Sequence, residues 1–316
     1  MKILNFGSIN IDHVYRVPHF VQPGETLNSL EYRRFPGGKG FNQSVALARA
    51  GAAVSHAGAI GHDGLWLAEY LQQCGVDTNH IAVTDTPTGH ALIHVDEKSG
   101  QNAILLDGGA NRKISATSIC PAMTHFTTAD MFLTQNETSA VPDAIRAAKA
   151  QGMTVAFNPA PMDTNVDAIP LDLVDILFVN ELEGAALAGT GVQEFRSSGV
   201  QNEEMAEVIL SVLRRRFPKM VIVLTLGKEG VMVSEPFKDL TTATGTSPLL
   251  SFHIPALPVT AVDTTAAGDC FIGYFLAATL EGRSPRDAAT LATRAAALTV
   301  TRPGAASSIP SRAELE

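Results

Sequence analysis

The seven residues from Asp263 to Asp269 combine two carboxylates with a run of small side chains between them. An apolar segment with helical spacing, Cys270 to Ala278, follows directly. Small residues that open a helix leave backbone N–H groups free at the positive end of the helix dipole, where an anion can bind. An aspartate in that first turn stands beside the bound anion. We therefore interpret Asp269 as the base of a phosphoryl-transfer site, against the alternative of an ordinary helix start with acidic capping residues.

A second turn, Gly37-Gly38-Lys39-Gly40-Phe41-Asn42-Gln43, is rich in glycine and leads into a helix of small residues that stops at Gly51. Its glycines let a ligand approach the backbone closely, and the turn brings Lys39 and Asn42 with it. It is not a Walker A motif, because glycine follows the Gly-Lys pair and the first glycine is misplaced. A lysine and an asparagine among three glycines favour a ligand site over a plain strand-to-helix turn.

Polar side chains recur where the expected strands end. They are Asn10 and Asp12, Gln135-Asn136-Glu137, Asn158-Pro159-Ala160-Pro161, Asn180-Glu181-Leu182-Glu183 and Thr225-Leu226-Gly227-Lys228-Glu229-Gly230. Each segment alone is as typical of a solvated strand end as of a site. Because the carboxyl ends of parallel strands meet at one edge of a sheet, where ligands bind, their clustering indicates a shared site.

Alternating strands and helices must position these residues. Strand patterns cover 2–7, 53–60, Met131–Gln135, Met153–Phe157, Val174–Val179, Met220–Leu226, Val231–Ser234 and Leu250–Ile254, and helical patterns cover 44–50, 64–74, 138–150, 181–189, 204–216, 267–281 and 285–299. Residues 190–203 and 236–248 are polar and are expected to be loops. The alternation predicts an α/β fold with a mostly parallel sheet and helices on both faces.

Two extended segments near the N-terminal half predict a second, smaller sheet. Residues 13–36 are punctuated by Pro18, Pro23 and Gly24 and are not helical. Thr88–Asp96 and Gln101–Asp107 have strand patterns on either side of a short turn, as in a hairpin. We expect the parts at about 13–35 and 88–107 to form a lid over the site. Pairing of such strands between two subunits would give a homodimer.

The composition bounds the class of protein. The chain has 316 residues, enough for one α/β domain with an appendage. Its net charge of −9 argues against a general nucleic-acid or anionic-membrane binder. Three scattered cysteines suggest neither a disulfide framework nor a zinc site, so a cytoplasmic location is expected. The N-terminal apolar run is too short for a signal peptide, and no apolar stretch is long enough for a membrane helix.

Three stretches of the sequence, taken together, point to a protein family more specifically than any one of them does alone. The segments 37–43, 180–183 and 263–269 resemble the ribokinase-like family of carbohydrate kinases, and segments near 7–13, 23–26, 158–161, 225–227 and 300–305 follow in the same order. The resemblance covers nearly the whole chain and is strongest to the members that phosphorylate ribose. It implies a single kinase domain over 1–316, built as a three-layer αβα sandwich with a small β-sheet lid. It also implies ATP-dependent phosphorylation of a furanose primary hydroxyl, with ribose 5-phosphate as the product.

The resemblance implies a role for each matching residue. Asp269 matches the catalytic base, and the anion hole matches Ala266, Ala267 and Gly268. The sugar positions match Asn10, Asp12, Gly38, Lys39, Asn42, Glu137 and Asp269, and the ATP positions match Asn180, Thr225, Gly227, Gly230 and Gly268. Asn180 and Glu183 match a motif that acts on Mg²⁺ through water. A monovalent-cation site, usually for K⁺, matches Asp263, Thr265, Thr299, Arg302, Gly304 and Ser308.

Several positions depart from the family pattern and leave the substrate open. Phe41 replaces the usual alanine, so we expect a change in the sugar pocket or the lid contact. Cys270 is expected to be a small buried residue, although its place beside Asp269 leaves thiol modification as a route of inhibition. Thr293 stands where histidine or asparagine often lies near adenine. Deoxyribose, a fructose-type sugar or a nucleoside remain alternative substrates, and a non-catalytic sugar-binding regulator remains an alternative function. A dinucleotide enzyme is disfavoured, because no Gly-x-Gly-x-x-Gly follows the first strand.

Overall fold

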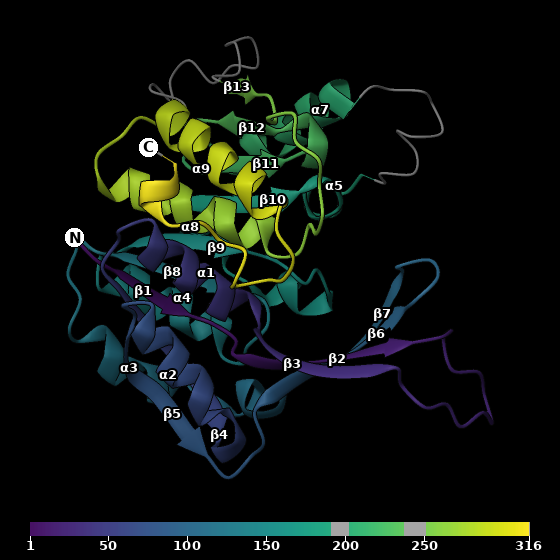
Figure 1. The fold of residues 1–316 in the computed structure, drawn as a ribbon. Helices are drawn as coiled ribbons and strands as arrows, with labels where there is room; N and C mark the ends of the chain where they lie inside the picture. The colour runs from purple at the N-terminus through teal and green to yellow at the C-terminus, as the bar shows by residue number, and fades with distance from the viewer. Residues whose placement is uncertain (191–201, 237–250, 316) are drawn as a thin grey trace.

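The computed structural model describes residues 1–190, 202–236 and 251–315. The two predicted loops at 190–203 and 236–248 fall largely on the remaining residues and lie outside the described ones. The described chain forms two separate sheets, and Figure 1 shows the smaller one reaching out from the body of the molecule.

The larger sheet has nine strands among the described residues. In spatial order they are β13 (Ser251–Ile254), β12 (Val231–Ser234), β11 (Val221–Thr225), β10 (Ile176–Asn180), β9 (Thr154–Asn158), β8 (Met131–Gln135), β1 (Ile3–Phe6), β4 (Val54–Gly61) and β5 (Asp77–Thr84). All neighbours pair in parallel except β12, which runs antiparallel to both β11 and β13. The prediction of a mostly parallel sheet is confirmed.

Helices cover both faces of this sheet. One face carries α1 (Lys39–Arg49), α2 (Leu65–Gln73), α8 (Ala267–Leu280) and α9 (Pro285–Thr299), and the other carries α3 (Ala116–Met123), α4 (Val141–Ala150), α5 (Glu181–Ala188) and α7 (Asn202–Arg216). Successive strand residues alternate between the two cores: Ile3 belongs to the first, and Leu4 belongs to the second. The result is the predicted three-layer αβα sandwich.

Short 3₁₀ segments complete the main body. They are η1 (His62–Gly64), η2 (Gly109–Lys113), η3 (Thr164–Ala168), η4 (Leu171–Leu173), η5 (Gly227–Glu229) and η7 (Arg312–Glu314). Segments η1 and η2 each join a strand to the next helix, η3, η4 and η5 lie between successive strands, and η7 follows α9.

The smaller sheet contains four strands in the order β3 (Glu31–Gly37), β2 (Asn10–Val17), β6 (Gly89–Asp96) and β7 (Asn102–Asp107). Its existence was predicted, but its first strand was misplaced. Strand β1 ends at Phe6, so Asn10 and Asp12 open a strand of the small sheet instead of closing a strand of the large one. The reason is that the chain leaves the body at Gly7 and continues directly as an extended strand.

Two elements of the main body were not predicted. Strand β5 is an edge strand whose residues are mostly half-exposed, so it lacks the continuous apolar pattern of a central strand. Helix α3 is only eight residues long and contains Pro121, which weakens any helical signal. Neither element carries a residue of the predicted site.

Helices α1 and α8 cross at very close range. A Cβ atom added to Gly273 of α8 would lie 2.4 Å from the Cβ atom of Ala46 in α1, which only glycine permits. This crossing brings the first turns of the two helices together, although more than 200 residues separate them. The two glycine-containing turns noted in the sequence therefore meet.

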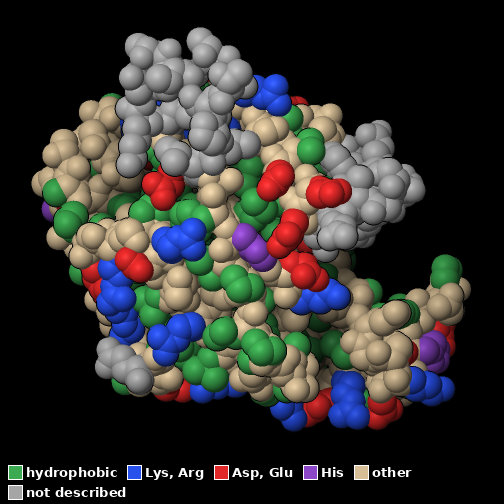
Figure 2. Space-filling model, turned by 90° about the horizontal axis from the view of Figure 1, so that it is seen from above, with side chains coloured by type: hydrophobic (Ala, Val, Ile, Leu, Met, Phe, Trp, Pro, Cys, Tyr) green, Lys and Arg blue, Asp and Glu red, His purple; other side chains and the backbone are tan. Residues whose placement is uncertain are grey.

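On the face of the molecule seen in Figure 2, Lys and Arg side chains are interspersed with Asp and Glu side chains. This mixed surface agrees with the net charge of −9 and gives no basic patch on that face. In the described ranges, no helix has both the length and the apolar character needed to cross a membrane.

Candidate active site

The first turn of α8 has the geometry of an anion site. Ala266 adopts a left-handed conformation with φ near 60° and starts the helix, and no side chain caps that start in the described part of the chain. A left-handed alanine is strained by about 1 kcal/mol, and such strain is common at functional turns. The strain is maintained because the following residues from Cys270 to Ala278 are buried in the core. The Ala267 N–H donates to the Thr264 carbonyl at 3.3 Å, and a helix start of this kind is a favourable place for an anion.

Asp269 stands in that turn and is held by two amide side chains from α1. Asn42 Nδ2 donates to Asp269 Oδ2 at 3.0 Å, and Gln43 Nε2 donates to Asp269 Oδ1 at 2.9 Å. Asp269 is only 9% exposed. A carboxylate held at both oxygens by neutral donors keeps a fixed orientation and has lone pairs left to accept a proton.

Two cavities meet at this turn. The larger, about 550 Å³, is lined by Thr225, Gly227, Lys228, Gly230, Ala256, Leu257, Pro258, Val259, Ala261, Thr264, Ala267, Gly268, Phe271, Thr293, Ala296, Ala297 and Val300. The smaller, about 240 Å³, is lined by Lys39, Asn158, Ala160, Phe178, Val179, Asn180, Glu183, Thr225, Thr264, Ala266, Gly268, Asp269 and Ile272. Thr225, Thr264 and Gly268 belong to both linings, so the anion site lies at the junction.

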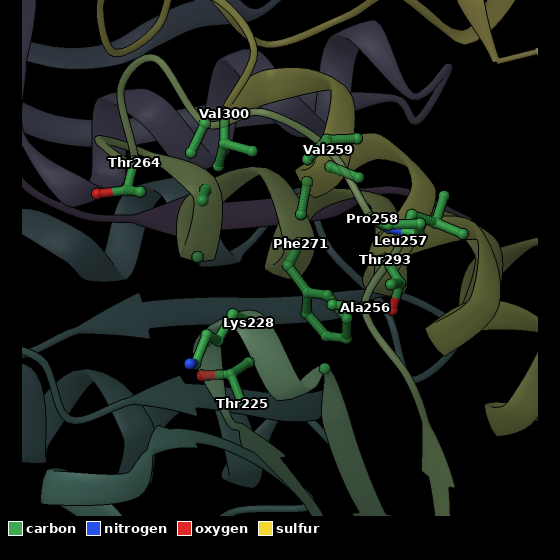
Figure 3. Close-up of a pocket in the computed structure, with 17 residues that line it drawn as sticks. Thr225, Lys228, Ala256, Leu257, Pro258, Val259, Thr264, Phe271, Thr293 and Val300 are labelled. Carbon is green, nitrogen blue, oxygen red and sulfur yellow. The ribbon is translucent and has the colours of Figure 1, made fainter.

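The two cavities differ in chemistry. Figure 3 shows the larger one, where Phe271 and the segment from Ala256 to Val259 form an apolar wall and the Thr293 side chain lies among them. Such a slot suits a flat aromatic base. The smaller cavity contains two carboxylates and Lys39, and it suits charged or hydroxyl-rich groups.

Lys39 supplies the positive charge of the smaller cavity. Burial lowers the pKa of Lys39, but three nearby carboxylates, Asp269, Glu137 and Glu183, outweigh this effect, so its pKa lies above the ordinary value. The ammonium group therefore stays charged at neutral pH, close to the anion site.

Asn180 and Glu183 hold each other at the start of α5. Asn180 Nδ2 and the Asn180 backbone N–H each donate to Glu183 at 3.0 Å, and Asn180 Oδ1 accepts from the Glu183 backbone N–H at 2.9 Å. This is a capping box, which presents the carboxylate to the smaller cavity. Burial raises the pKa of Glu183, and its hydrogen bond from Asn180 and the charge of Lys39 oppose that rise. Each carboxylate oxygen keeps a lone pair for a water or a cation.

The predicted sugar residues gather at the base of the small sheet. Glu137 Oε2 accepts from the Lys39 backbone N–H at 3.0 Å and from the Ser8 hydroxyl. Asn10 Oδ1 accepts from Asn111 Nδ2 at 2.8 Å, so a buried asparagine fixes the Asn10 amide. Burial and, to a smaller extent, the charge of Glu137 together raise the pKa of Asp12 to about 7.

The predicted cation residues lie in one corner beside the anion site. Asp263 Oδ1 accepts from the Thr265 backbone N–H at 2.9 Å, and Asp263 Oδ2 accepts from the Gly304 backbone N–H at 2.9 Å. Burial raises the pKa of Asp263, but these bonds outweigh it and hold the pKa below its usual value. The Thr299 and Ser308 side chains are buried, and the Asp263 backbone N–H donates to the carbonyl of Val300, the residue after Thr299, at 3.2 Å. The donor set is therefore one carboxylate with hydroxyl and backbone oxygens, which fits a hard monovalent cation.

The expectation for Phe41 is wrong, whereas the expectation that Cys270 is a small buried residue is confirmed. Phe41 is fully buried, and its ring lies 5.6 Å from the Tyr70 ring in the core between α1 and α2, so it lines neither cavity. Its side chain points away from the site because α1 turns successive residues to different faces. Cys270 is also fully buried, and burial raises the pKa of its thiol to about 12, so it is not a reactive thiol.

Some residues of the site were given no role by the sequence analysis. Gln43 was quoted as part of a motif without a role, and Asn111 carried no signal. Asn158 was noted only as a strand end, yet it lines the smaller cavity. The segment from 256 to 261 lines the larger cavity but has no regular structure. A buried amide on a short 3₁₀ segment and an irregular apolar stretch have no local pattern that marks them.

Comparisons with known proteins agree with this geometry. The family model described as pfkB family carbohydrate kinase matches residues 1–312. The ribokinase of Haemophilus influenzae is 41% identical over 313 residues, covering 98% of this chain and 95% of that protein. Two solved structures have the same fold over 99% of this chain. The ribokinase of Cryptococcus neoformans in complex with ADP has a TM-score of 0.83, 32% identity and 98% of its chain covered. The Arabidopsis thaliana ribokinase complexed with ribose and ATP has a TM-score of 0.81, 27% identity and 97% covered.

Proposed function

The chain belongs to the pfkB family of carbohydrate kinases, and we propose that it transfers the γ-phosphoryl group of ATP to the primary hydroxyl of ribose. It is a phosphotransferase with an alcohol group as acceptor. The observation that carries the proposal is the position of Asp269 in the smaller cavity, beside Gly268, which lines both cavities. A base there can reach an acceptor hydroxyl in the smaller cavity while the phosphates of a nucleotide extend into it from the larger one.

Asp269 is proposed as the catalytic base. It takes the proton of the attacking hydroxyl while the new O–P bond forms and the bond to the leaving phosphate oxygen breaks. The amides of Asn42 and Gln43 hold its carboxylate for this role.

Charge stabilisation is assigned to the turn and to one lysine. The backbone N–H groups of Ala266, Ala267 and Gly268 face the equatorial phosphoryl oxygens, where negative charge is spread in the transition state. Lys39, which stays charged between three carboxylates, adds a positive charge on the same side. Phosphoryl transfer needs positioning and charge stabilisation more than covalent help from the protein.

The larger cavity is assigned to the nucleotide and the smaller one to the phosphates and the acceptor. Thr225, Gly227, Gly230 and Gly268 are proposed to line ATP, with the adenine against Phe271. The sugar hydroxyls are assigned to Asn10, Asp12, Gly38, Lys39, Asn42 and Glu137, since carboxylates and amides can both accept from and donate to hydroxyls. Ribose is favoured by the names of the relatives; another furanose or a nucleoside is the alternative.

Two cations are proposed. Mg²⁺ would be held through water by Asn180 and Glu183, and it would neutralise charge on the phosphates. K⁺ would be held by the carboxylate of Asp263 with oxygens of Thr265, Thr299, Arg302, Gly304 and Ser308. Because Asp263 directly precedes the anion turn, we assign K⁺ an activating role on the shape of that turn. The free cysteines in the described chain support a cytoplasmic location.

The test is an ADP-release assay with a panel of pentoses, hexoses and nucleosides, each with and without K⁺. We expect ribose to give the highest kcat/KM and K⁺ to raise kcat. A hexose or nucleoside that is turned over better than ribose would overturn the substrate assignment. Absence of turnover with every acceptor, together with sugar binding by calorimetry, would favour a non-catalytic regulator instead.

A further inference from the structure

A continuous chain of buried polar side chains lies behind Asp269. It runs from Gln43 through Gln135, Asn5 and Ser44 to His56, and each of these five residues is fully buried. They come from four different elements, namely α1, β8, β1 and β4. A buried polar network is retained when its members satisfy one another, and it then fixes their orientations.

At the end of this network farthest from Asp269, the His56 ring has one possible tautomer. Burial lowers the pKa of His56 to about 4, so its ring is neutral at physiological pH. His56 Nε2 lies 3.2 Å from the Gly7 carbonyl oxygen, which can only accept, so the proton is on Nε2. His56 Nδ1 is therefore an acceptor, and the Ser44 hydroxyl, 2.8 Å away, donates to it.

The assignment at His56 fixes which group donates in each of the other hydrogen bonds of this network. Because Ser44 Oγ gives its proton to His56, it accepts from Asn5 Nδ2 at 2.8 Å, and Asn5 Nδ2 also donates to the Gly40 carbonyl at 2.8 Å. Asn5 Oδ1 then accepts from Gln135 Nε2 at 3.0 Å. Gln135 Nε2 has a second proton, which it donates to Gln43 Oε1 at 2.6 Å.

The last amide is thereby oriented toward the base. With its oxygen engaged by Gln135, Gln43 must present its NH₂ group to Asp269 Oδ1, and the opposite orientation would place a carbonyl oxygen against a carboxylate oxygen. Gln135 Oε1 is buried and has no hydrogen-bond partner among the described residues. This unpaired acceptor is a cost of the arrangement, in which both protons of Gln135 Nε2 are used.

We propose that Gln43 is a positioning residue for Asp269, and that the chain ending at His56 holds the Gln43 amide in its donating orientation. This inference rests on the proposed phosphotransfer and extends it to a residue that does not touch the substrate. The consequence is that the carboxylate of Asp269 already has its working orientation before the sugar binds.

The test uses the full-length protein with Gln43→Met, which has a similar length but no donor, and Gln43→Glu, which replaces the donor by an acceptor. We expect kcat to fall by about 10- to 100-fold, the usual effect of losing a hydrogen bond to a charged group. KM for ribose and for ATP should stay within about twofold, since Gln43 acts through Asp269. The acidic limb of the pH–rate profile should move to higher pH in both variants.

A second pair of variants tests the chain itself. Ser44→Ala removes a link but leaves Gln43 and Asp269 in place. Ser55→Ala removes another buried serine hydroxyl, which donates to Asp77 outside this hydrogen-bonded network. Ser44→Ala should lower kcat by about 3- to 10-fold, and Ser55→Ala should leave it unchanged. Thermal unfolding midpoints measured for all variants separate lost activity from lost folding.

Two outcomes overturn the inference, and a third overturns the proposed function beneath it. Gln43 variants with wild-type kcat and an unmoved acidic limb would remove the positioning role. Equal kcat for Ser44→Ala and Ser55→Ala would remove the role of the chain, and this pair remains informative even where the Gln43 variants do not fold. A wild-type protein that releases no ADP with any acceptor would instead refute the proposed function, on which the inference rests.

Discussion

At the scale of single residues, Asp269 on α8 accepts hydrogen bonds from two side chains of α1. Its two oxygens accept from Asn42 and Gln43, and Lys39 places a positive charge nearby. The carboxylate is thus held at both oxygens and almost enclosed. These are the conditions under which a carboxylate can act as a general base on an alcohol.

Replacing this base is the first prediction. Asp269→Asn should lower kcat by about 10³-fold, because general-base catalysis contributes roughly 10²- to 10⁴-fold. Sugar and ATP dissociation constants should change little, since the amide keeps the shape of the side chain. Steady-state kinetics and calorimetry measure the two effects. Asp143→Asn, an exposed site on α4, is the matched control, and near-normal turnover in Asp269→Asn would refute the assignment.

The second prediction concerns pH and Asp12. Its pKa is raised from 3.8 to about 7, so the ligand-free folded state holds a proton that the unfolded state releases above about pH 4. The free energy of unfolding should therefore fall as pH rises from about 4 toward 7. Sugar hydroxyls donate to the ionised form, so sugar binding should strengthen as pH rises to about 7 and level off above it.

The expected slope is about tenfold in Kd per pH unit below the pKa when only the ionised form binds. Titration calorimetry with ribose between pH 5.5 and 8 measures it. Asp12→Asn, which cannot titrate, should flatten the dependence. A Kd that stays constant over this pH range in the wild-type protein would contradict the role of Asp12.

At the scale of elements, two helix starts are brought together by glycine. The crossing of α1 and α8 at Gly273 sets how far Asn42 and Gln43 lie from Asp269. A second close approach fixes α1 against β1, since a Cβ atom at Gly40 would lie 2.5 Å from Gly7 Cα. The geometry of the site therefore depends on backbone contacts that admit no side chain.

The third prediction separates stability from activity at two glycines. Gly40→Ala forces backbone atoms apart and should lower the free energy of unfolding by about 1–3 kcal/mol or more, the usual range for overpacking. Gly268→Ala has no atom within 4 Å of its added Cβ, so it should keep wild-type stability. Its methyl group enters the space where the cavities meet, so kcat/KM for ATP should fall by about 10- to 100-fold.

Urea denaturation and steady-state kinetics on both variants make the comparison. Each variant serves as the control for the other, because both add one methyl group at a turn of the site. A stable Gly40→Ala protein, or a Gly268→Ala protein that loses stability but keeps its activity, would contradict this division.

At the scale of the whole molecule, the small sheet leaves apolar surface uncovered. Ile104, Leu105 and Leu106 on the edge strand β7 are 55%, 67% and 53% exposed. An exposed apolar edge strand is a pairing surface. We propose that it packs against the small sheet of a second copy, which gives a homodimer with each small sheet acting as a lid.

The fourth prediction is the assembly state. Sedimentation velocity at micromolar concentration should give a dimer for the wild-type protein. The double variant Ile104→Lys, Leu106→Lys places two charges on one face of β7 and should be monomeric, because charge on an edge strand prevents pairing. Leu182→Lys, at an exposed leucine on α5, should stay dimeric. A monomeric wild-type protein would refute the proposal.

The sequence by itself determined the parts of this protein whose signals are local. Helix starts, glycine stops and strand periodicity depend on near neighbours, so they predicted the αβα layers, the small sheet and the turn at Asp269. The weak or irregular elements, β5 and α3, were missed because an edge strand and a short helix with proline lack such patterns.

The tertiary structure alone decided which side chains meet. Asn42 and Gln43 lie 227 and 226 residues from Asp269 along the chain, and only the strand order and the α1–α8 crossing bring them together. The same packing turned Phe41 into the core and away from the sugar, against the expectation from its place in the motif. Contacts between distant segments depend on the global arrangement of the sheet, and no local pattern encodes that arrangement.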